Sequence, residues 1–502
     1  MIKNSLDRIV PFNPYEGVQK VKTTTFISPK KDKTYDYDKY SEDLDKLLQE
    51  LNLHDGMTFS FHHHLRNGDF VLNMVMEKIA ALGIKDITIC ASSLFPVHQP
   101  LVKMFEEEIV TKVYAAYISG PVALAISEGK VKDVCVMHSH GYRSTMLQTG
   151  EVKVDVAFIA APGSSKEGNL SGSEGPSSCG VLGYAVADAH FAKKVVAITD
   201  HICEPKDIEI PKECVDYVVK VDRIGDPQGI VSGTTKITKD PVGLRIAKMT
   251  AQLMKATGLL KDGFSFQTGA GGISLAVAKE VRDIMVQENI KGGFASGGTT
   301  SYLTNMLQEG LFKNIYDVQC FELDAVESIK NNPNHKKISA YDYADILNEN
   351  NVANKLDFVI LGASEIDLDY NVNVSTGTDG TILGGSGGHS DTAAGAKLSI
   401  IVSKLVSSRI SVLTKRVTTV TTPGETIDVL VTDRGIAINP RHQELIAHLK
   451  ETTQLPIKTM EELYDIAISL TGQPASVKLS DEVVALSQYR DGTIIDVLYK
   501  TT

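Results

Sequence analysis

The chain has 502 residues, 42% of them hydrophobic and 23% charged, values typical of a folded globular protein with more than one domain. Its formal net charge of -11 is spread along the chain and argues against a general nucleic-acid-binding protein. The six cysteines show no C-x-x-C spacing, no secretory signal is evident, and no apolar run is long enough for a membrane helix. We therefore expect a cytoplasmic protein with reduced thiols that binds neither nucleic acid nor a membrane.

Helical patterns alternate with short apolar, β-rich runs, which predicts a mainly parallel α/β architecture. In chain order, the helical patterns cover Glu42–Leu51, Asp69–Leu82, Val242–Thr257, Ser274–Glu288 and Thr300–Gln308. The strand candidates are Ile87–Ala91, Val154–Ala161, Lys194–Thr199, Val215–Val221, Phe358–Leu361 and Asp428–Thr432. A further helical pattern over Thr392–Val406 follows a glycine-rich stretch.

The two halves of the chain repeat one another at three places, in the same order. HDGMTF from His54 matches KDGFSF from Lys261, at an offset of 207 residues, and ICASS from Ile89 matches GFASG from Gly293. At an offset of 202, the residues Asp155, Asn169, Ser173 and Gly175 fall on Asp357, Asn371, Ser375 and Gly377. Three matches in one order predict two related α/β domains.

The boundary between the two domains is expected near Lys239-Asp240-Pro241, where a proline follows polar residues and a helix begins. We assign residues 37–240 to the first domain and residues 241–502 to the second. Residues 1–36 have little periodicity and form either an arm that packs on a partner or a flexible tail. In paired open α/β sheets the ligand site lies beyond the carboxyl ends of the strands, so we expect the active site in the cleft between the domains.

Equivalent loops in the two halves offer different chemistry. The first loop holds three histidines at positions 62–64, followed by Arg66 and Asn67, whereas the second reads QTGAGG from Gln267. A guanidinium fork with imidazole donors suits a small polycarboxylate, and we expect His62, His64, Arg66 and Asn67 to hold it. The histidines and Asp69 could instead bind a metal, but no H-E-x-x-H spacing supports this and we expect none. A purely structural set of polar groups is the third interpretation.

The stretch ILGGSGGHSDTAAGAKL from Ile382 to Leu398 places four glycines directly before His389, Ser390 and Asp391. Glycines ahead of a helical pattern leave backbone N–H groups free for an anion or a developing oxyanion. We expect the N–H groups of Gly387 and Gly388 to be the donors. The alternative is a tight turn from a strand into a helix.

Other motifs are less informative. The chain has no G-x-G-x-x-G fingerprint and no P-loop, which argues against dinucleotide binding and ATP hydrolysis, and we expect no serine hydrolase chemistry. Ser171–Gly175 contains a glutamate that could act as a nucleophile, or is a structural turn. A basic run, made of Lys404, Arg409, Lys415 and Arg416, is either a solvated face or a docking patch for an acidic partner.

Several of these motifs resemble a known family. The segments Gly384–Lys397, Asn371–Ser375 and Val431–Ala437 resemble the second domain of CoA-transferases. SFHHHLRNGD over Ser60–Asp69 and the C-terminal segment Tyr489–Val497 narrow the resemblance to the citrate lyase α-subunit family. The similarity extends over essentially the whole chain, so it implies two related CoA-transferase-like domains.

The resemblance also implies an activity and partners. An α subunit of this family exchanges the acetyl group on the acyl carrier (γ) subunit for citrate and releases acetate, and the lyase (β) subunit then cleaves the citryl group. The thiol belongs to the carrier's phosphoribosyl-dephospho-CoA arm, or to a free CoA thioester, so we expect no tightly bound cofactor. A homo-oligomer within the complex is expected. A transferase or thioesterase for another small carboxylate, a non-catalytic scaffold and a metabolite-binding regulator are the alternatives.

One departure from the wider CoA-transferase pattern bears on mechanism. Members that form an enzyme-bound thioester carry a glutamate after the strand that here reads GFASGGTT from Gly293, and this stretch has no acidic residue. We therefore expect a ternary complex in which citrate attacks the thioester directly and forms a mixed anhydride. The expected catalytic residues are Gly387, Gly388, His389, Ser296, Gly297 and Gly298. The residues expected to bind the carrier's arm are Gly269, Gly271, Gly272, Gly384, Gly385 and Asp391.

Overall fold

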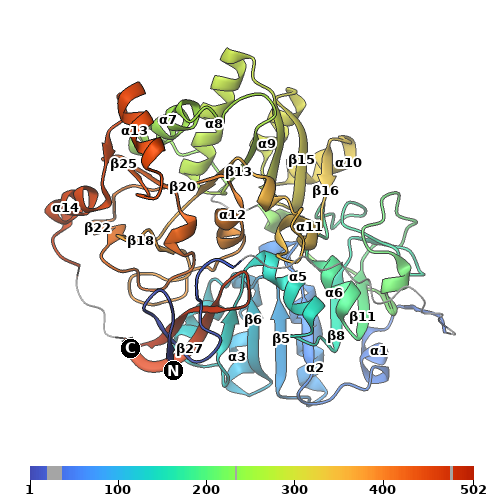
Figure 1. Ribbon diagram of the computed structural model, residues 1–502. Helices are drawn as coiled ribbons and strands as arrows, with labels where there is room; N and C mark the ends of the chain where they lie inside the picture. Colours follow the sequence, from blue (N-terminus) through green and yellow to red (C-terminus); the bar gives the residue numbers. More distant parts are fainter. Residues whose placement is uncertain (20–34, 36, 232–234, 475–478) are drawn as a thin grey trace.

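The computed structural model describes residues 1–19, 35, 37–231, 235–474 and 479–502. These residues form two lobes, each built on a large and mainly parallel sheet (Figure 1). Each lobe has its own apolar core, with Phe59 and Phe158 buried in the first and Phe266 and Phe358 buried in the second. No helix among the described residues is long and apolar enough to cross a membrane.

The first sheet has ten strands, and every neighbouring pair is parallel except the terminal hairpin. In spatial order they are β28 (Ile494–Thr501), β27 (Leu479–Gln488), β7 (Cys135–Met137), β6 (Val110–Ala115), β5 (Ile87–Ala91), β4 (Thr58–Phe61), β8 (Val156–Ala160), β11 (Lys194–Thr199), β12 (Tyr217–Lys220) and β3 (Tyr40–Ser41). Its helices are α1 (Leu44–Glu50), α2 (Val71–Ala81), α3 (Leu101–Glu106), α4 (Pro121–Ser127), α5 (His140–Thr149) and α6 (Ala185–Phe191).

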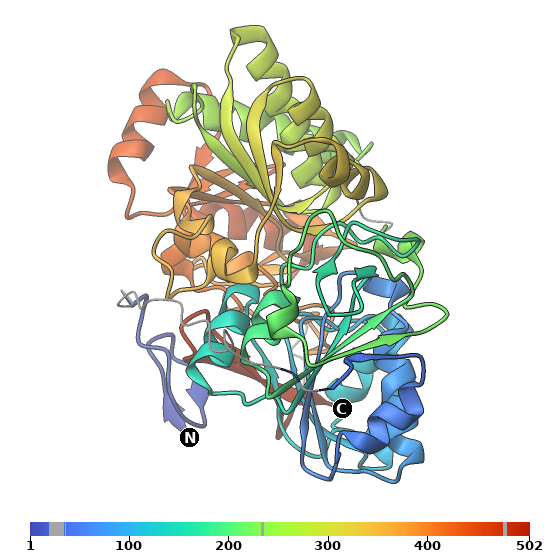
Figure 2. The ribbon, with the colours of Figure 1, turned by 90° about the vertical axis from the view of Figure 1, so that its right-hand side faces the viewer.

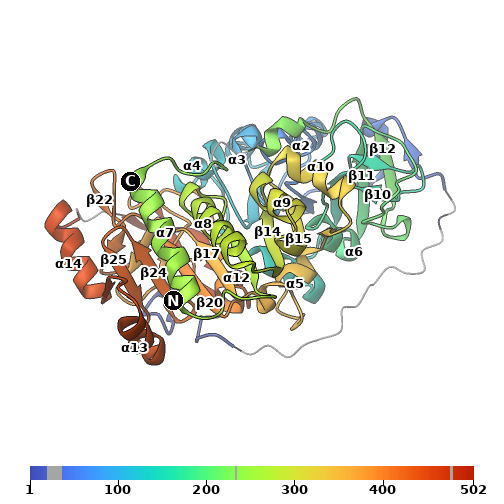
Figure 3. The same ribbon diagram turned by 90° about the horizontal axis from the view of Figure 1, so that it is seen from above.

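The second sheet has nine strands, with one antiparallel pair, β24 and β25. In spatial order they are β16 (His335–Lys337), β15 (Phe312–Cys320), β14 (Gly292–Thr299), β13 (Ser265–Thr268), β17 (Phe358–Leu361), β20 (Leu398–Val402), β24 (Val429–Thr432), β25 (Gly435–Ile438) and β26 (Ile457–Lys458). Its helices are α7 (Pro241–Ala256), α8 (Gly272–Glu288), α9 (Ser301–Gln308), α10 (Leu323–Asn331), α11 (Ala340–Ala344), α12 (His389–Gly395), α13 (Gln443–Thr452) and α14 (Met460–Thr471). Figure 3 shows α7 and α8 packed side by side over this sheet.

Short strands complete the described structure. They are β1 (Ile2–Lys3), β2 (Ile9–Val10), β9 (Gly163–Ser164), β10 (Leu170–Ser171), β18 (Glu365–Asp367), β19 (Val372–Asn373), β21 (Val406–Ser407), β22 (Ile410–Ser411) and β23 (Leu413–Thr414). β18, β19 and β23 form a small separate sheet in the second lobe.

The strand and helix patterns of the sequence are confirmed, with one exception. Each of the six strand candidates contains a strand, and each of the first five helical patterns contains a helix. The helix predicted over Thr392–Val406 is wrong, because α12 ends at Gly395 and the buried strand β20 follows. A Cβ at Gly395 would lie 2.6 Å from the carbonyl oxygen of Ala353, so only glycine fits at this position. An apolar run buried on both faces of a parallel sheet has no periodicity that separates strand from helix.

The repeat between the halves is confirmed by matching contacts. β5-β4-β8-β11 in the first sheet corresponds to β14-β13-β17-β20 in the second. The Asp155 carboxylate accepts from the Thr58 N–H at 2.9 Å and from Lys193 at 2.6 Å. Its equivalent, Asp357, accepts from the Ser265 N–H at 2.8 Å and from Lys397 at 2.7 Å. Each half therefore pins its central strands with the same carboxylate.

The boundary helix α7 begins where the sequence predicts. Asp240 caps it, because its Oδ2 accepts from the Gly243 N–H at 3.0 Å, and Pro241 occupies the first helical position. The end of the chain departs from the expected range 241–502, since β27 pairs with β7 and returns residues 479–501 to the first sheet. Figure 2 shows this hairpin in the lower lobe, away from the strands of the second half.

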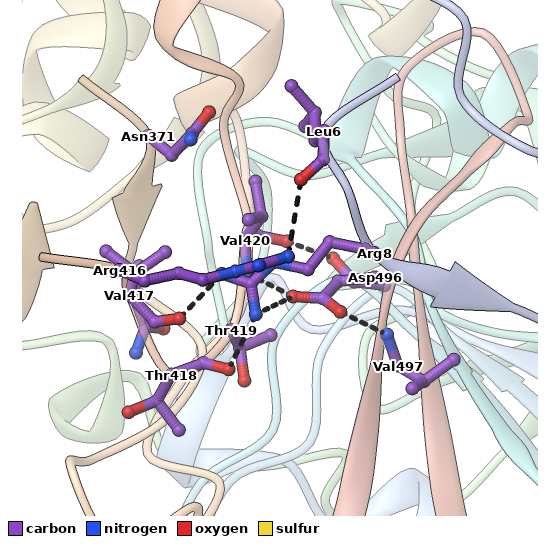
Figure 4. Close-up of polar contacts among 12 residues, drawn as sticks. Leu6, Arg8, Asn371, Arg416, Val417, Thr418, Thr419, Val420, Asp496 and Val497 are labelled. Atoms are coloured by element: carbon purple, nitrogen blue, oxygen red, sulfur yellow. Dashed lines mark hydrogen bonds and ion pairs between the residues drawn. The ribbon is translucent and has the colours of Figure 1, made fainter. Parts of the chain in front are cut away.

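Residues 1–19 of the expected N-terminal arm pack on this same hairpin. The Arg8 guanidinium lies 3.3 Å from the Asp496 carboxylate, which also accepts from the Val420 N–H at 2.8 Å (Figure 4). Arg416, from the basic run, donates to the Leu6 carbonyl at 3.4 Å. The arm, the hairpin and a segment of the second lobe are thus fastened together at one buried carboxylate. Residues 20–34 and 36 of the expected arm lie outside the described residues.

Candidate active site

A cavity of about 350 Å³ lies between the lobes and is lined by residues of both. The carboxyl ends of parallel strands, which gather ligand sites in open α/β sheets, supply its walls. From the first half it is lined by His63, Arg66, Ser93, Phe95, Tyr117, His140 and Tyr184. From the second half the lining includes Gln267–Ala270, Gly298, Phe321, Tyr343 and Gly385–His389. The two repeat-equivalent loops, after β4 and after β13, therefore face one cavity.

Arg66 is the charged residue of this wall. It begins a 3₁₀ turn at a φ of +53°, and a Cβ at the neighbouring Gly68 would clash with the Asp226 carbonyl, so this close approach fixes the turn. The guanidinium carbon lies 4.2 Å from the ring centroid of Phe321. Its Nη1 is buried without a hydrogen-bond partner among the described residues, and burial lowers the pKa of the guanidinium. A guanidinium stays charged in proteins, so this wall presents an unpaired cation to the cavity.

The histidine loop is arranged differently from the expectation. β4 ends at Phe61, so strand alternation stops there, and His62 and His64 lie buried with their Nδ1 atoms against each other, off the cavity wall. His63 lines the cavity instead. Burial lowers the pKa of all three imidazoles. Asn67 is exposed and accepts from the Val97 N–H at 3.0 Å. Of the four expected citrate ligands, Arg66 alone reaches the wall.

The glycine loops of the second half divide between wall and scaffold. Gly269 and Gly298 line the cavity, whereas Gly271 caps α8 and Gly272 begins it, both off the wall. A Cβ at Gly298 would clash with the ring of Phe321, so glycine is required for that ring to reach Arg66. Two further expected residues, Ser296 and Gly297, lie behind the wall: Ser296 donates to the Tyr316 carbonyl at 2.8 Å, and Gly297 has a φ of +111°.

In the GGSGGHSD stretch, Gly385 and Gly387–His389 line the cavity and Gly384 does not. The Gly387 N–H donates to the Ala116 carbonyl at 3.1 Å, so the expected donor role of this N–H is wrong. Its carbonyl in turn accepts from the His140 N–H at 2.7 Å. Backbone hydrogen bonds therefore hold this loop against the first lobe. The donor role of Gly388 stays a prediction.

His389 and Asp391 hold this loop in place. Both ring nitrogens of His389 are engaged, Nδ1 with the Thr422 hydroxyl at 2.8 Å and Nε2 with the Gly362 carbonyl at 2.9 Å. Burial lowers its pKa to about 4, so the ring is neutral near pH 7 and serves to orient the loop. His389 is among the expected catalytic residues, and these contacts leave its ring no free nitrogen for the substrate.

Asp391 is fully buried behind the wall, where it bridges the lobes. Its carboxylate accepts from the Ser139 hydroxyl at 2.8 Å and the Gly141 N–H at 2.9 Å, and Arg490 lies 3.7 Å away. Burial raises its pKa to about 6. The sequence predicts that Asp391 binds the carrier's arm, but this buried position does not suit direct binding. Asp391 instead ties the loop to the start of α5.

Sequence reasoning missed His63, His140, Tyr184 and Tyr343. His140 follows the apolar run Cys135–Met137, and this position after a short strand is the signal that could have found it. The Tyr343 hydroxyl accepts from the Gln267 side chain at 2.9 Å across the cavity wall.

The described lining contains no aspartate or glutamate. Glu174, the candidate nucleophile of Ser171–Gly175, does not line the cavity. Among the described residues, no group of three or more His, Cys, Asp or Glu side chains is arranged to hold a metal ion. The wall can therefore bind an anion through Arg66 and neutral donors, and its described residues offer no carboxylate nucleophile.

The paired α/β lobes, with a cleft between them, have a CoA-transferase-like fold. The chain belongs to the citrate lyase α-subunit family, because it matches the family described as "Citrate lyase, alpha subunit (CitF)" over residues 37–501. It is accordingly an enzyme of the transferase class.

Curated relatives and solved structures agree with this assignment. The chain is 44% identical to the citrate lyase alpha chain of Haemophilus influenzae, over 91% of this chain and 92% of the relative. It is 43% identical to that of Escherichia coli, over 92% and 91%. A structure described as the α subunit of citrate lyase in complex with citrate, from Streptococcus mutans, shares 42% identity at a TM-score of 0.96 and covers 99% of this chain and 100% of its own. The α subunit of a malonate decarboxylase from Acinetobacter baumannii shares the fold at 14% identity, with a TM-score of 0.62, over 88% of this chain and 95% of its own.

Proposed function

We propose that the chain is the citrate CoA-transferase of a citrate lyase complex and exchanges acetyl for citryl on the thiol of an acyl carrier subunit. The observation that carries this proposal is the Arg66 guanidinium, whose buried Nη1 has no hydrogen-bond partner among the described residues, on a cavity whose described lining has no acidic residue. A relative at 42% identity is described in complex with citrate, which supports citrate as the anion. The partners are the lyase (β) and acyl carrier (γ) subunits, and the chain forms a homo-oligomer within the complex.

The chain supplies the site and its partner supplies the thiol. We assign the reacting thiol to the phosphoribosyl-dephospho-CoA arm of the carrier, which free CoA thioester can replace, so the chain needs no tightly bound cofactor of its own. A cavity of about 350 Å³ lies at the lower end of the range of roughly 300–1,000 Å³ typical of ligand pockets. Citrate and the reacting end of the thioester fill such a volume, and the rest of the arm lies outside it.

The exchange proceeds by two acyl transfers in a ternary complex. A citrate carboxylate oxygen adds to the acetyl thioester carbonyl, the carbonyl electron pair moves to oxygen, and collapse of this adduct expels the thiolate and leaves an acetyl-citryl anhydride. The thiolate then adds to the citryl carbonyl of the anhydride and expels acetate. Alignment and oxyanion stabilisation provide the rate enhancement. The absence of acidic residues from the described lining supports this route over an enzyme-bound thioester.

The purified chain tests the proposal when it is incubated with acetyl-CoA and labelled citrate. We expect labelled citryl-CoA and stoichiometric acetate from citrate, and much slower exchange with other small acids. A different preferred acid would indicate a transferase for another carboxylate. Thioester hydrolysis without exchange would indicate a thioesterase, and the absence of any turnover would indicate a scaffold or a regulator. Borohydride and hydroxylamine trapping during turnover tests the route, since a stable adduct on Glu174 or another carboxylate would contradict the direct attack.

A further inference from the structure

His140 is a cavity-lining side chain to which no role has been given so far. Its ring stacks on His63, with centroids 5.5 Å apart and planes 12° apart, and lies tilted by 35° against Tyr184, with centroids 4.6 Å apart. Nδ1 is buried without a hydrogen-bond partner, and Nε2 makes no hydrogen bond among the described residues. A Cβ at Gly387 would lie 3.5 Å from Nε2, so the ring edge lies beside the glycine loop.

The backbone around His140 is held more firmly than its side chain. The His140 N–H donates to the Gly387 carbonyl at 2.7 Å. The residues on either side are bound to Asp391, through the Ser139 hydroxyl at 2.8 Å and the Gly141 N–H at 2.9 Å. A Cβ at Gly141 would clash with the Ala344 carbonyl, so this close packing also depends on glycine. Three consecutive residues are thus fixed against the second lobe, and the imidazole that they carry lines the cavity with its Nε2 free of hydrogen bonds to the described residues.

We propose that His140 is a catalytic residue of the exchange, whose neutral imidazole N–H donates a hydrogen bond to the oxyanion formed on each acyl carbonyl. This inference rests on the proposed function. Asp391 is then a positioning residue, because it acts on the reaction only through the backbone that carries His140. The donor replaces the Gly387 N–H, which the Ala116 carbonyl already occupies.

A neutral donor suits the chemistry of this exchange. In both steps a carboxylate or thiolate adds to a carbonyl carbon, the carbonyl electron pair moves to oxygen, and an anionic group leaves, so no proton has to be transferred. Burial, together with His138, Arg143 and Arg66, lowers the pKa of His140 to about 3. The ring therefore keeps a single N–H near neutral pH and stabilises negative charge where it develops, whereas a permanent cation would also bind the ground-state carboxylates.

The test compares three variants in the citrate and acetyl-CoA exchange assay. H140A removes the donor, H140Q keeps an N–H close to the position of Nε2, and H54A removes an exposed histidine outside the cavity. We expect H140A to lower kcat by about 100-fold with a citrate KM within about threefold of wild type, as for loss of an oxyanion donor. H140Q should recover at least about tenfold of that loss, and H54A should match the wild type. Citrate binding by calorimetry and the Tm should be similar in all four proteins.

Results other than those expected would contradict the role of His140, the inference as a whole or the proposed function. A raised citrate KM with unchanged kcat in H140A would make His140 a citrate ligand and overturn the oxyanion role. Equal losses in H140A and H140Q, with a lowered Tm, would make the role structural. Wild-type exchange with an unaffected H140A would overturn the inference and leave the proposed function intact, whereas a wild type without exchange would overturn both.

Discussion

Replacing Arg66 by methionine removes the unpaired guanidinium while keeping an unbranched side chain between Phe95 and Phe321. Methionine has no charge and no donor, so the variant loses the contact to the citrate carboxylate and little of the packing. Both residues are non-glycine, so the left-handed φ of +53° is equally strained in the two proteins.

The size of the effect follows from the surroundings of Arg66. Arg66 is partly buried and its Nη1 has no protein partner within the described residues, so a bound carboxylate would make a charge-assisted hydrogen bond largely shielded from bulk water. Such a bond contributes about 1.5–3 kcal/mol, which weakens citrate binding by about 10- to 150-fold when it is lost. An unpaired buried charge also carries a desolvation cost. The Tm of citrate-free Arg66→Met should therefore equal or exceed that of the wild type.

Citrate titration by calorimetry measures the citrate affinity, and thermal shift measures the Tm with and without citrate. A ligand stabilises the folded state in proportion to its occupancy, so the citrate-dependent rise in Tm should shrink in Arg66→Met at a fixed citrate concentration. Arg66→Lys restores a charge without the planar fork and should bind citrate with intermediate affinity. Arg282→Ala, which breaks an exposed ion pair with Glu309, is the matched control and should bind as the wild type does. Unchanged citrate affinity in Arg66→Met would refute the assignment of Arg66 as the citrate ligand.

Three further predictions follow from the buried contacts. Burial raises the pKa of Asp391 from 3.8 to about 6, so the folded state holds this proton more tightly than the unfolded state and stability falls as pH rises between these values. Denaturant titrations measure the unfolding free energy of Asp391→Asn and of the wild type at several pH values. The difference between them should shift in favour of the variant by up to about 3 kcal/mol as the pH rises from about 4 to about 7, and a difference that does not change with pH would contradict this. Arg8→Met leaves the Asp496 carboxylate buried and unpaired and should lower the unfolding free energy by about 3 kcal/mol. In a double-mutant cycle, adding Asp496→Asn should recover part of this loss. Losses that simply add would rule out coupling between the two residues. A Cβ at Gly388 would clash with the Tyr343 hydroxyl, so Gly388→Ala should lower the exchange rate by roughly tenfold or more and Tyr343→Phe should restore part of it; no recovery would place the clash elsewhere.

The sequence determined the parts of this protein that depend on local pattern. Strands such as β5, β11 and β17 have the predicted bounds, since short β-rich runs flanked by polar residues specify a strand without reference to the rest of the chain. The internal repeat correctly paired Asp155 with Asp357, and these residues make the same contacts in both lobes. The GGSGGHSD stretch correctly pointed to a wall of the cavity between the lobes.

Only the tertiary structure decided which side chains reach the cavity. His63 lines the cavity while His62 and His64 do not, because the turn after β4 is set by the approach of Gly68 to Asp226, far away in the sequence. The Gly387 N–H is occupied by Ala116 of the other lobe, and His140 lies beside it through contacts to Asp391. Such contacts join residues that no local pattern relates. A sequence therefore specifies strands and loops through short local runs and the residues that flank them, but the direction of a side chain beyond a strand end is fixed by packing partners that only the folded chain brings together.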